Sequence, residues 1–235
     1  MRTTSILGTL LTLVLLSANP KAVGQDCKNY YFMNEGTEVE MTVYDRKGDV
    51  SGRNVSKVKE VKSSGSRSEA TITATSYNNK GKEMMSTGNM TVICEGGTYS
   101  VDLRNMVSPE MMGGMNGMDV RVTGNMAEYP SSVQPGMALK DASMTAEPTT
   151  GGMVLMRLSV SLKNRKVDGK ESVTTPAGTF DCYKITYDAN IKTIVGVNFQ
   201  GTEWFAPGFG IVKTESTRNG KPMGSTLITR VGKTQ

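Results

Sequence analysis

Apolar and polar residues alternate along most of the chain with a period of two, which is the pattern of a β-strand with one buried face. The first clear run is 38–44, where Val39, Met41 and Val43 would share a face, and the polar segment 45–48 then predicts a hairpin turn. Further strands are predicted at 55–61, 71–77, 89–94, 98–103, 119–123, 154–162, 166–174, 181–187, 191–199, 202–205, 211–216 and 225–231.

So many short strands predict one mainly β domain over 25–235, folded as a curved antiparallel sheet or half-barrel, because a flat sheet of this size would expose long edges. The proline-containing segment near 128–148 is the expected crossover between the two halves of the sheet. One stretch departs from the β pattern: Ser108, Pro109 and Glu110 resemble the start of a helix, which predicts a short Met-rich helix over 109–116.

The N-terminal segment has the form of a secretory signal peptide. Arg2 precedes an apolar run over 6–16, and small residues at Ala22 and Gly24 predict cleavage before Gln25. Cys27 raises the alternative of a lipid-modified cysteine, but Asp26 stands where a lipobox requires a small residue. We therefore expect an exported protein, periplasmic or secreted, that is not lipidated and has no transmembrane anchor.

The charge gives little support for a nucleic-acid partner. Loss of residues 1–24 removes Arg2 and Lys21 from 27 basic residues and none of the 22 acidic residues, so the formal charge falls from +5 to +3. The basic residues are also scattered along the chain, whereas nucleic-acid binding proteins gather them on one face.

The mature segment would carry three cysteines into an oxidising compartment, which allows at most one internal disulfide. We expect Cys27 to pair with Cys94, because this bond would tie a loose N-terminus to the end of a strand. Cys182 lies within a strand pattern and is expected to be a buried small hydrophobe.

Histidine is absent, which excludes histidine-based catalysis and the usual zinc sites. Glu203, beside the single tryptophan Trp204, is the best-placed acid, but glycoside hydrolysis needs a second carboxylate that the sequence does not mark. The segment 203–213 is better explained as a hairpin corner, since Pro207 cannot donate to a ladder and two glycines permit a sharp return. We expect no enzymatic activity and no cofactor.

Methionine is unusually frequent around the predicted helix. The residues Met111, Met112, Met115 and Met118 would line an apolar lid or pocket, because the unbranched thioether fills irregular gaps. Trp204 and Phe205 would add to the wall of this pocket. The alternative is a Cu(I) site formed by Met112, Met115 and Met118, since thioethers are soft ligands.

Three separated blocks together resemble a known family. They are DCKNYYFMNEGTEVEMTVYDRKGD at 26–49, TPAGTFDCYKITYD at 175–188 and EWFAPGFGIVKTES at 203–216, and they resemble the TapB-like or DUF3108-like group of exported bacterial proteins, common in Bacteroidetes. The resemblance covers nearly the whole mature chain. It implies a curved half-barrel similar to that of periplasmic lipoprotein carriers, with a concave face able to hold an apolar molecule.

These observations favour a non-catalytic exported protein that binds a hydrophobic or lipid-like ligand, or a segment of an envelope protein. A Cu(I)-binding protein is the first alternative. The second is an interaction module of a surface assembly, for which an exposed and unpaired edge strand would be the distinguishing feature.

Overall fold

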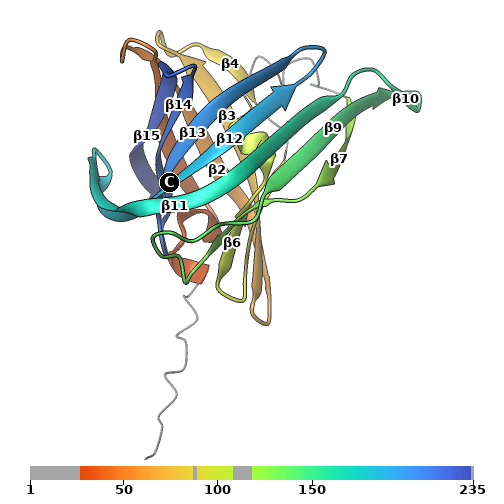
Figure 1. Ribbon diagram of the computed structural model, residues 1–235. Coiled ribbons are helices and arrows are strands. Elements are labelled where there is room, and N and C mark those ends of the chain that lie inside the picture. The colour runs from red at the N-terminus through yellow and green to blue at the C-terminus, as the bar shows by residue number, and fades with distance from the viewer. Residues whose placement is uncertain (1–26, 87–88, 108–117, 234–235) are drawn as a thin grey trace, which may run out of the picture.

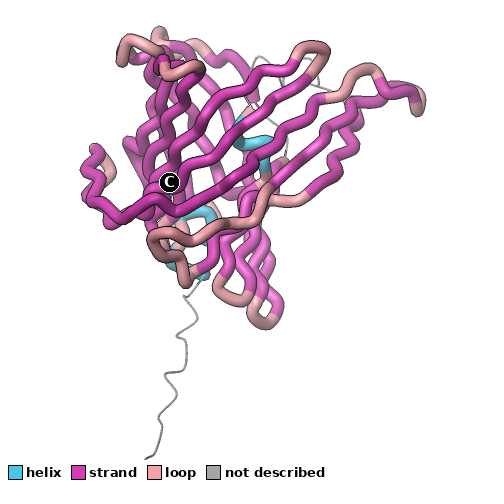
Figure 2. The backbone as a smooth tube through the Cα atoms, in the orientation of Figure 1, coloured by secondary structure: helices cyan, strands magenta, loops and turns pink. Residues whose placement is uncertain are grey.

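The structure is a computed structural model that describes residues 27–86, 89–107 and 118–233. The predicted signal peptide and the helix predicted over 109–116 lie outside these residues. The described elements are almost entirely strands, and the helical ones are three short 3-10 turns, η1 (Cys27–Asn29), η2 (Tyr31–Met33) and η3 (Leu103–Met106) (Figure 2). None of the described helical elements is long and apolar enough to cross a membrane.

Fifteen strands form a single antiparallel sheet, which confirms the mainly β prediction. The main path runs β10-β9-β11-β12-β13-β14-β15-β1-β2-β3-β5-β6-β8, while β4 pairs with β3 and β7 pairs with β9. The bounds are β1 (Thr37–Asp45), β2 (Val50–Ser64), β3 (Arg67–Asn78), β4 (Glu83–Ser86), β5 (Met90–Glu95), β6 (Thr98–Val101), β7 (Asp119–Gly124), β8 (Ala127–Pro130), β9 (Ala142–Thr150), β10 (Met153–Val154), β11 (Leu158–Thr175), β12 (Gly178–Lys192), β13 (Gly196–Ala206), β14 (Gly210–Arg218) and β15 (Lys221–Lys233).

The sheet curls around its own inner face without closing (Figure 1). The turns that join β1 to β2, β3 to β4, β9 to β10, β12 to β13 and β14 to β15 lie at one end, which we call the rim. The turns η1 and η2 lie at the opposite end, which we call the base. The half-barrel expected from the alternating sequence is therefore present.

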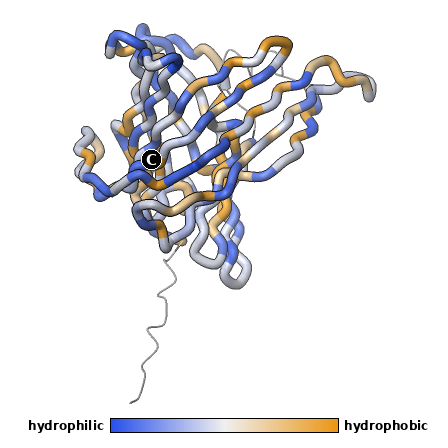
Figure 3. The backbone as a smooth tube through the Cα atoms, viewed as in Figure 1, coloured by the Kyte–Doolittle hydropathy of each residue, from blue (hydrophilic) through white to orange (hydrophobic). Residues whose placement is uncertain are grey.

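Alternation along each strand produces the core. Apolar positions repeat every second residue (Figure 3), and those on the inner face are buried, among them Val39, Ile72, Ile185, Phe205 and Ile228. Their neighbours along the strands face outward and are mostly polar. Burial of these side chains is the main stabilising contribution, at about 25 cal/mol per Å² of apolar surface.

The N-terminal segment closes the base of the sheet. Cys27 is bonded to Cys94 on β5, as predicted, and Tyr30, Tyr31, Phe32 and Met33 are all buried. The Tyr31 hydroxyl donates to the carbonyl of Ile211 (3.1 Å) and accepts from the amide of the same residue (3.0 Å). The segment is thus held both covalently and by hydrogen bonds.

Two predicted strand boundaries are wrong. The strands expected at 154–162 and 166–174 are one strand, β11, because a bulge between Lys163 and Lys166 absorbs the irregularity without ending the ladder. The strand expected at 191–199 is instead broken after Lys192, where the chain turns back into β13. Apolar residues alternate on both sides of this turn, so the sequence pattern looked like one continuous strand.

The connection from β8 to β9 is residues 131–141. Within it, Gly136 donates its amide to Val167 O (2.8 Å) and Leu139 donates to Arg165 O (2.8 Å). This connection therefore runs beside the bulged part of β11 and forms backbone hydrogen bonds with its edge.

Candidate functional site

A charged residue enters the core at the bulge of β11. Asn164 adopts a positive φ of 54°, which lets the ladder skip a residue between Lys163 and Lys166. Asn tolerates this left-handed conformation better than most residues. The Arg165 side chain consequently faces the inner side of the sheet, where its exposure is 1%.

Arg165 meets Glu203 of β13 in the interior. Arg165 Nη2 lies 3.6 Å from Glu203 Oε1, and both residues are 1% exposed. The Tyr129 hydroxyl donates to Glu203 Oε2 at 3.0 Å. Arg165 Nη1 donates to the carbonyls of Glu128 (3.1 Å) and Lys140 (3.0 Å), so the guanidinium joins β8, the following connection and β13.

Burial raises the pKa of the Glu203 carboxyl above its usual value, while the Arg165 charge and the Tyr129 hydrogen bond act in the opposite direction. Burial also raises the pKa of Tyr129, and the nearby Glu203 charge adds to this effect. A raised carboxyl pKa in an enclosed site is a common property of catalytic acids. Here, however, the partners of Glu203 are an arginine and a tyrosine rather than a second acid, so the paired-carboxylate arrangement of a glycosidase is not formed.

Aromatic rings fill the space between this ion pair and the base. The Tyr30 and Tyr99 rings stack at 4.2 Å between centroids, and those of Tyr129 and Phe205 stack at 4.7 Å. All four residues are almost completely buried. The base half of the interior is thus packed with side chains, and Phe205 is part of this packing.

Trp204 lies on the opposite face from Phe205, as adjacent residues of a strand must. Its indole Nε1 donates to Glu171 Oε1 on β11, and Lys213 Nζ lies 4.3 Å from the centroid of its ring system. Lys184 Nζ lies 5.7 Å from the same ring system. The structure therefore does not bring Trp204 and Phe205 onto one wall; Trp204 is an outer-face residue covered by long polar side chains.

The remaining predicted pocket residues are methionines in the segment before β7. Met111, Met112 and Met115 lie outside the described residues, and Met118, which immediately precedes β7, is exposed. The lid and the Cu(I) site built from these methionines both stay predictions.

The rim half of the inner face is lined differently from the base half. The Thr214 and Thr226 hydroxyls are 2.8 Å apart, and the Ser76 hydroxyl donates to Asn54 Oδ1 at 2.6 Å. These residues occupy inner positions by register and remain partly exposed. Hydroxyl and amide groups thus interrupt the apolar wall that a lipid-like ligand would need.

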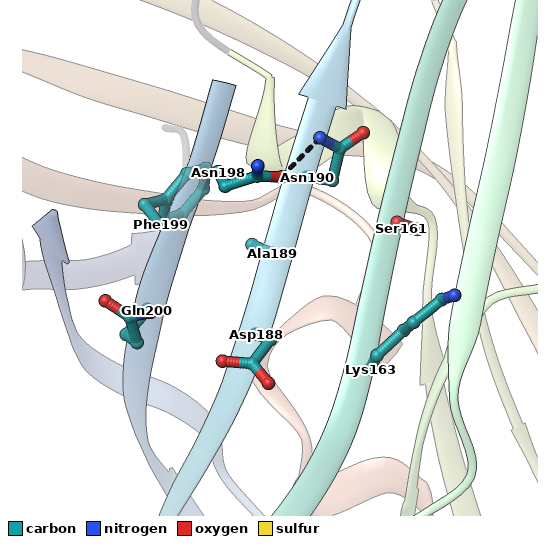
Figure 4. A pocket seen from close by; sticks show the side chains of 8 residues that line it. All are labelled: Ser161, Lys163, Asp188, Ala189, Asn190, Asn198, Phe199 and Gln200. Carbon is teal, nitrogen blue, oxygen red and sulfur yellow. Dashed lines mark hydrogen bonds between the residues drawn. The ribbon is translucent and has the colours of Figure 1, made fainter. Parts of the chain in front are cut away.

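A surface hollow of about 430 Å³ lies on β11, β12 and β13 (Figure 4). Two outward rows cross the three strands, Ser161–Asn190–Asn198 and Lys163–Asp188–Gln200, and Asn190 Nδ2 donates to Asn198 Oδ1 at 2.6 Å. Sequence reasoning did not select these residues, because alternating polar positions are typical of any solvent-facing strand. The lining can form hydrogen bonds with a polar ligand but contains no catalytic grouping.

Strand β7 is an exposed strand at an edge of the described sheet. Five of its six residues are exposed, and its one strand partner among the described residues is β9. Asn125, just after β7, donates its amide to Ser143 O on β9 at 2.8 Å. Because the backbone amides and carbonyls of successive residues in a strand point to opposite sides, those of Val120 and Val122 point away from β9, toward the edge that has no strand partner among the described residues; we call it the free edge. Pro148 lies opposite Val120 on β9, and its carbonyl accepts from the Leu155 amide (3.0 Å), so this carbonyl points away from β7. Val120 and Pro148 therefore do not form hydrogen bonds with each other, as the alternation requires.

The chain belongs to the DUF3108-like family, whose model matches residues 34–228. A search of curated proteins finds no match. The chain is similar to a crystal structure described as an exported protein with a YmcC-like fold from Bacteroides fragilis NCTC 9343, with 25% identity and a TM-score of 0.72 over 87% of this chain and 99% of that one. It is also similar to a structure described as a lipoprotein from Parabacteroides distasonis ATCC 8503, with 26% identity and a TM-score of 0.71 over 86% of this chain and 98% of that one. The family resemblance based on three sequence blocks is confirmed.

Proposed function

We propose that this member of the DUF3108-like family is a non-catalytic exported protein that binds an extended segment of another envelope protein along the free edge of β7. The observation that carries the proposal is the backbone of Val120 and Val122, whose amides and carbonyls point to the open side of an exposed strand. An added strand would satisfy these groups with main-chain hydrogen bonds, which is the usual mode of strand addition.

The export half of the proposal is supported by both structural neighbours, which are described as an exported protein and a lipoprotein. We further propose that this chain is not lipidated at Cys27. The Cys27 sulfur is bonded to Cys94, and a sulfur held in a disulfide cannot carry a thioether-linked lipid.

A buried lipid-like ligand, the other binding mode expected from the sequence, has less support. The base half of the interior is packed by Tyr30, Tyr99, Tyr129 and Phe205, and the rim half carries hydroxyl groups. The edge of β7 needs no internal space, so it agrees better with this interior.

The test uses a photo-crosslinking amino acid in the protein expressed in its own host. It replaces Val122 on the edge or, as a control, Val231 on β15, which has the same exposure of 37%. A synthetic peptide from a protein crosslinked only through position 122 is then added, and hydrogen exchange is measured at the Val120 and Val122 amides. Slower exchange at both amides supports strand addition.

A proline variant separates the backbone from the side chain. Val122→Pro removes the outward donor but keeps the hydrogen bonds to β9, so peptide binding should be lost with little effect on folding. Val122→Thr keeps the donor and should bind like the wild type. Equal binding by the wild type and the proline variant, or unchanged exchange at both amides, would refute the proposal.

A further inference from the structure

Two hairpin tips at the rim carry the three most exposed large apolar side chains among the described residues. Ile194 and Val195 form the β12–β13 turn, with exposures of 94% and 74%, and Met153 at the β9–β10 tip has an exposure of 70%. Val154 and Leu155 follow Met153 and are half exposed. Exposure of this degree has a solvation cost and indicates a surface that is covered in the working state.

The two tips project from one region of the sheet. Strands β9 and β12 are the two neighbours of β11, so a single strand separates their hairpins. Both tips are apolar and lie toward the same end of the molecule (Figures 1 and 3). Together they form an apolar surface made of two separate protrusions, which we call the rim tips and which consists of 153–155 and 194–195.

Basic side chains lie just behind the rim tips. Lys192 ends β12 and is exposed. Arg121 and Arg157 both pair with the single carboxylate of Glu147, at 2.6 Å each, and both arginine side chains remain more than half exposed. Two cations on one anion leave one positive charge beside the β9–β10 tip, and Asp119 at the start of β7 balances it, so the excess positive charge next to the rim tips comes from Lys192.

The other rim turns increase the positive charge. They carry the exposed side chains Arg46, Lys47, Lys80, Lys82, Arg218 and Lys221. The acids on these turns are Asp45, Asp49 and Glu83. The backbone amides of Lys47 and Asp49 donate to Asp45, which lowers the pKa of this carboxyl. Because the six basic side chains on these turns outnumber the three acids, the rim as a whole is positively charged.

We propose that the rim docks onto an anionic lipid surface. The rim tips enter the boundary between headgroups and acyl chains, and the basic side chains lie at the level of the lipid phosphates. Shallow insertion of apolar side chains, combined with attraction of Lys and Arg to anionic lipids, is a general mode of peripheral membrane binding. The base, with Cys27, then points away from this surface.

The shape and charge of the rim favour a lipid surface over the other occupants. Protein interfaces usually centre on aromatic or arginine anchors in a packed patch, whereas the rim tips are aliphatic and separated. A bilayer accepts separated protrusions because lipids rearrange around them. Two copies of this chain meeting rim to rim would bring positively charged surfaces together, which is unfavourable.

The experiment is vesicle flotation of the exported protein. Vesicles of pure phosphatidylcholine are compared with vesicles containing about 30% phosphatidylglycerol, at low and high salt. We expect flotation with the anionic vesicles and a loss of it at high salt, because salt screens the attraction between exposed charges. The double variant Ile194→Ser with Val195→Ser should bind the anionic vesicles roughly tenfold more weakly, as expected when two inserted aliphatic side chains are lost.

The matched control is Val231→Ser, which removes an exposed valine far along β15 from the rim and should float like the wild type. The double variant changes only a turn without buried contacts, and circular dichroism with thermal unfolding verifies that it folds. Absence of flotation with both vesicle types would overturn the proposal. So would a wild-type dimer in light scattering that the double variant abolishes, since a second copy would then cover the rim tips. Lipid binding has a readout separate from peptide binding at β7, so either proposal can fail alone.

Discussion

Arg165 and Glu203 form an ion pair in the interior of the sheet, 3.6 Å apart and each 1% exposed. They come from β11 and β13, which are separated by β12, and the pair also contacts Tyr129 of β8. The pair therefore connects β8, at one end of the strand order, with β11 and β13, which lie toward the other end. Removal of one charge leaves the other buried without its counter-ion, and the first prediction follows from this.

Arg165→Met should lower the free energy of unfolding by about 3 kcal/mol or more, the cost typical of breaking a buried ion pair. Adding Glu203→Gln should recover part of the loss, because no unpaired charge then remains in the core. Urea unfolding of the wild type, both single variants and the double variant measures this coupling. The exposed pair Arg230–Glu38 provides the control, since Arg230→Met should cost less than about 1 kcal/mol. Additive effects of the two core substitutions would contradict the prediction.

The raised pKa of Glu203 predicts a dependence of stability on pH. Its pKa in the folded state is above the ordinary value of 4.5, so the folded protein binds the proton more tightly than the unfolded chain does. The resulting stabilisation is complete below about 4.5 and is lost as the pH rises through the folded-state pKa. The stability of the wild type relative to Glu203→Gln should therefore fall as the pH rises from 4.5. A difference that stays constant between about pH 4 and 8, measured by urea unfolding, would contradict this.

The Cys27–Cys94 bond should account for a large share of the stability. It joins residues 67 positions apart, and closing a loop of this length is worth about 4 kcal/mol in the chain-entropy model. Cys27→Ala with Cys94→Ala should lower the free energy of unfolding by about this amount, and Tyr30–Met33 should become accessible to protease. The buried Cys182, whose pKa burial raises to about 12, should stay unreactive toward thiol reagents at about pH 8 in the wild type until the protein unfolds.

Gly201 should tolerate no side chain. An added Cβ would lie 2.1 Å from Cε2 of Tyr187, whose ring is buried on the inner face and packs across this position. Gly201→Ala should cost about 2 kcal/mol, in the range of overpacked cores. Gly169 on β11 is the matched control, since a Cβ added there would have no heavy atom within 4 Å, and Gly169→Ala should change stability by less than about 0.5 kcal/mol. Thermal unfolding of the two variants and the wild type measures both changes in stability, and equal effects of the two substitutions would contradict the prediction.

The sequence did not predict most of the contacts around Glu203. The corner at 203–213 is the β13–β14 hairpin, where Gly208 has a φ of 77° and Phe209 donates to Ala206 O at 3.0 Å. The sequence marked Glu203 as an isolated acid, because its partners Arg165 and Tyr129 lie 38 and 74 positions away. Nothing in the residues around Arg165 distinguishes it from its solvent-facing neighbours Lys163 and Lys166.

At the rim tips, the sequence pattern was clear but predicted the wrong element. The sequence predicted one strand over 191–199, and this prediction is wrong because the chain turns at 193–195. No glycine or proline occurs between Lys192 and Val195, so the usual turn residues gave no signal before Gly196. The apolar residues at 194–195, which the pattern assigned to a strand, are the most exposed large apolar residues in the described chain.

Alternation and turn residues along the chain predicted most of the strands, their two faces and the glycine-bearing turns, and the disulfide and the family were predicted correctly too, because each of these depends on neighbouring residues or on a few separated blocks. The direction in which Arg165 points, the contacts of Glu203, and the partners that cover Trp204 on the outer face depend instead on the folded sheet. This difference arises because alternation records only which residues share a face. The pairing of distant strands and the curl of the sheet then determine what each face meets.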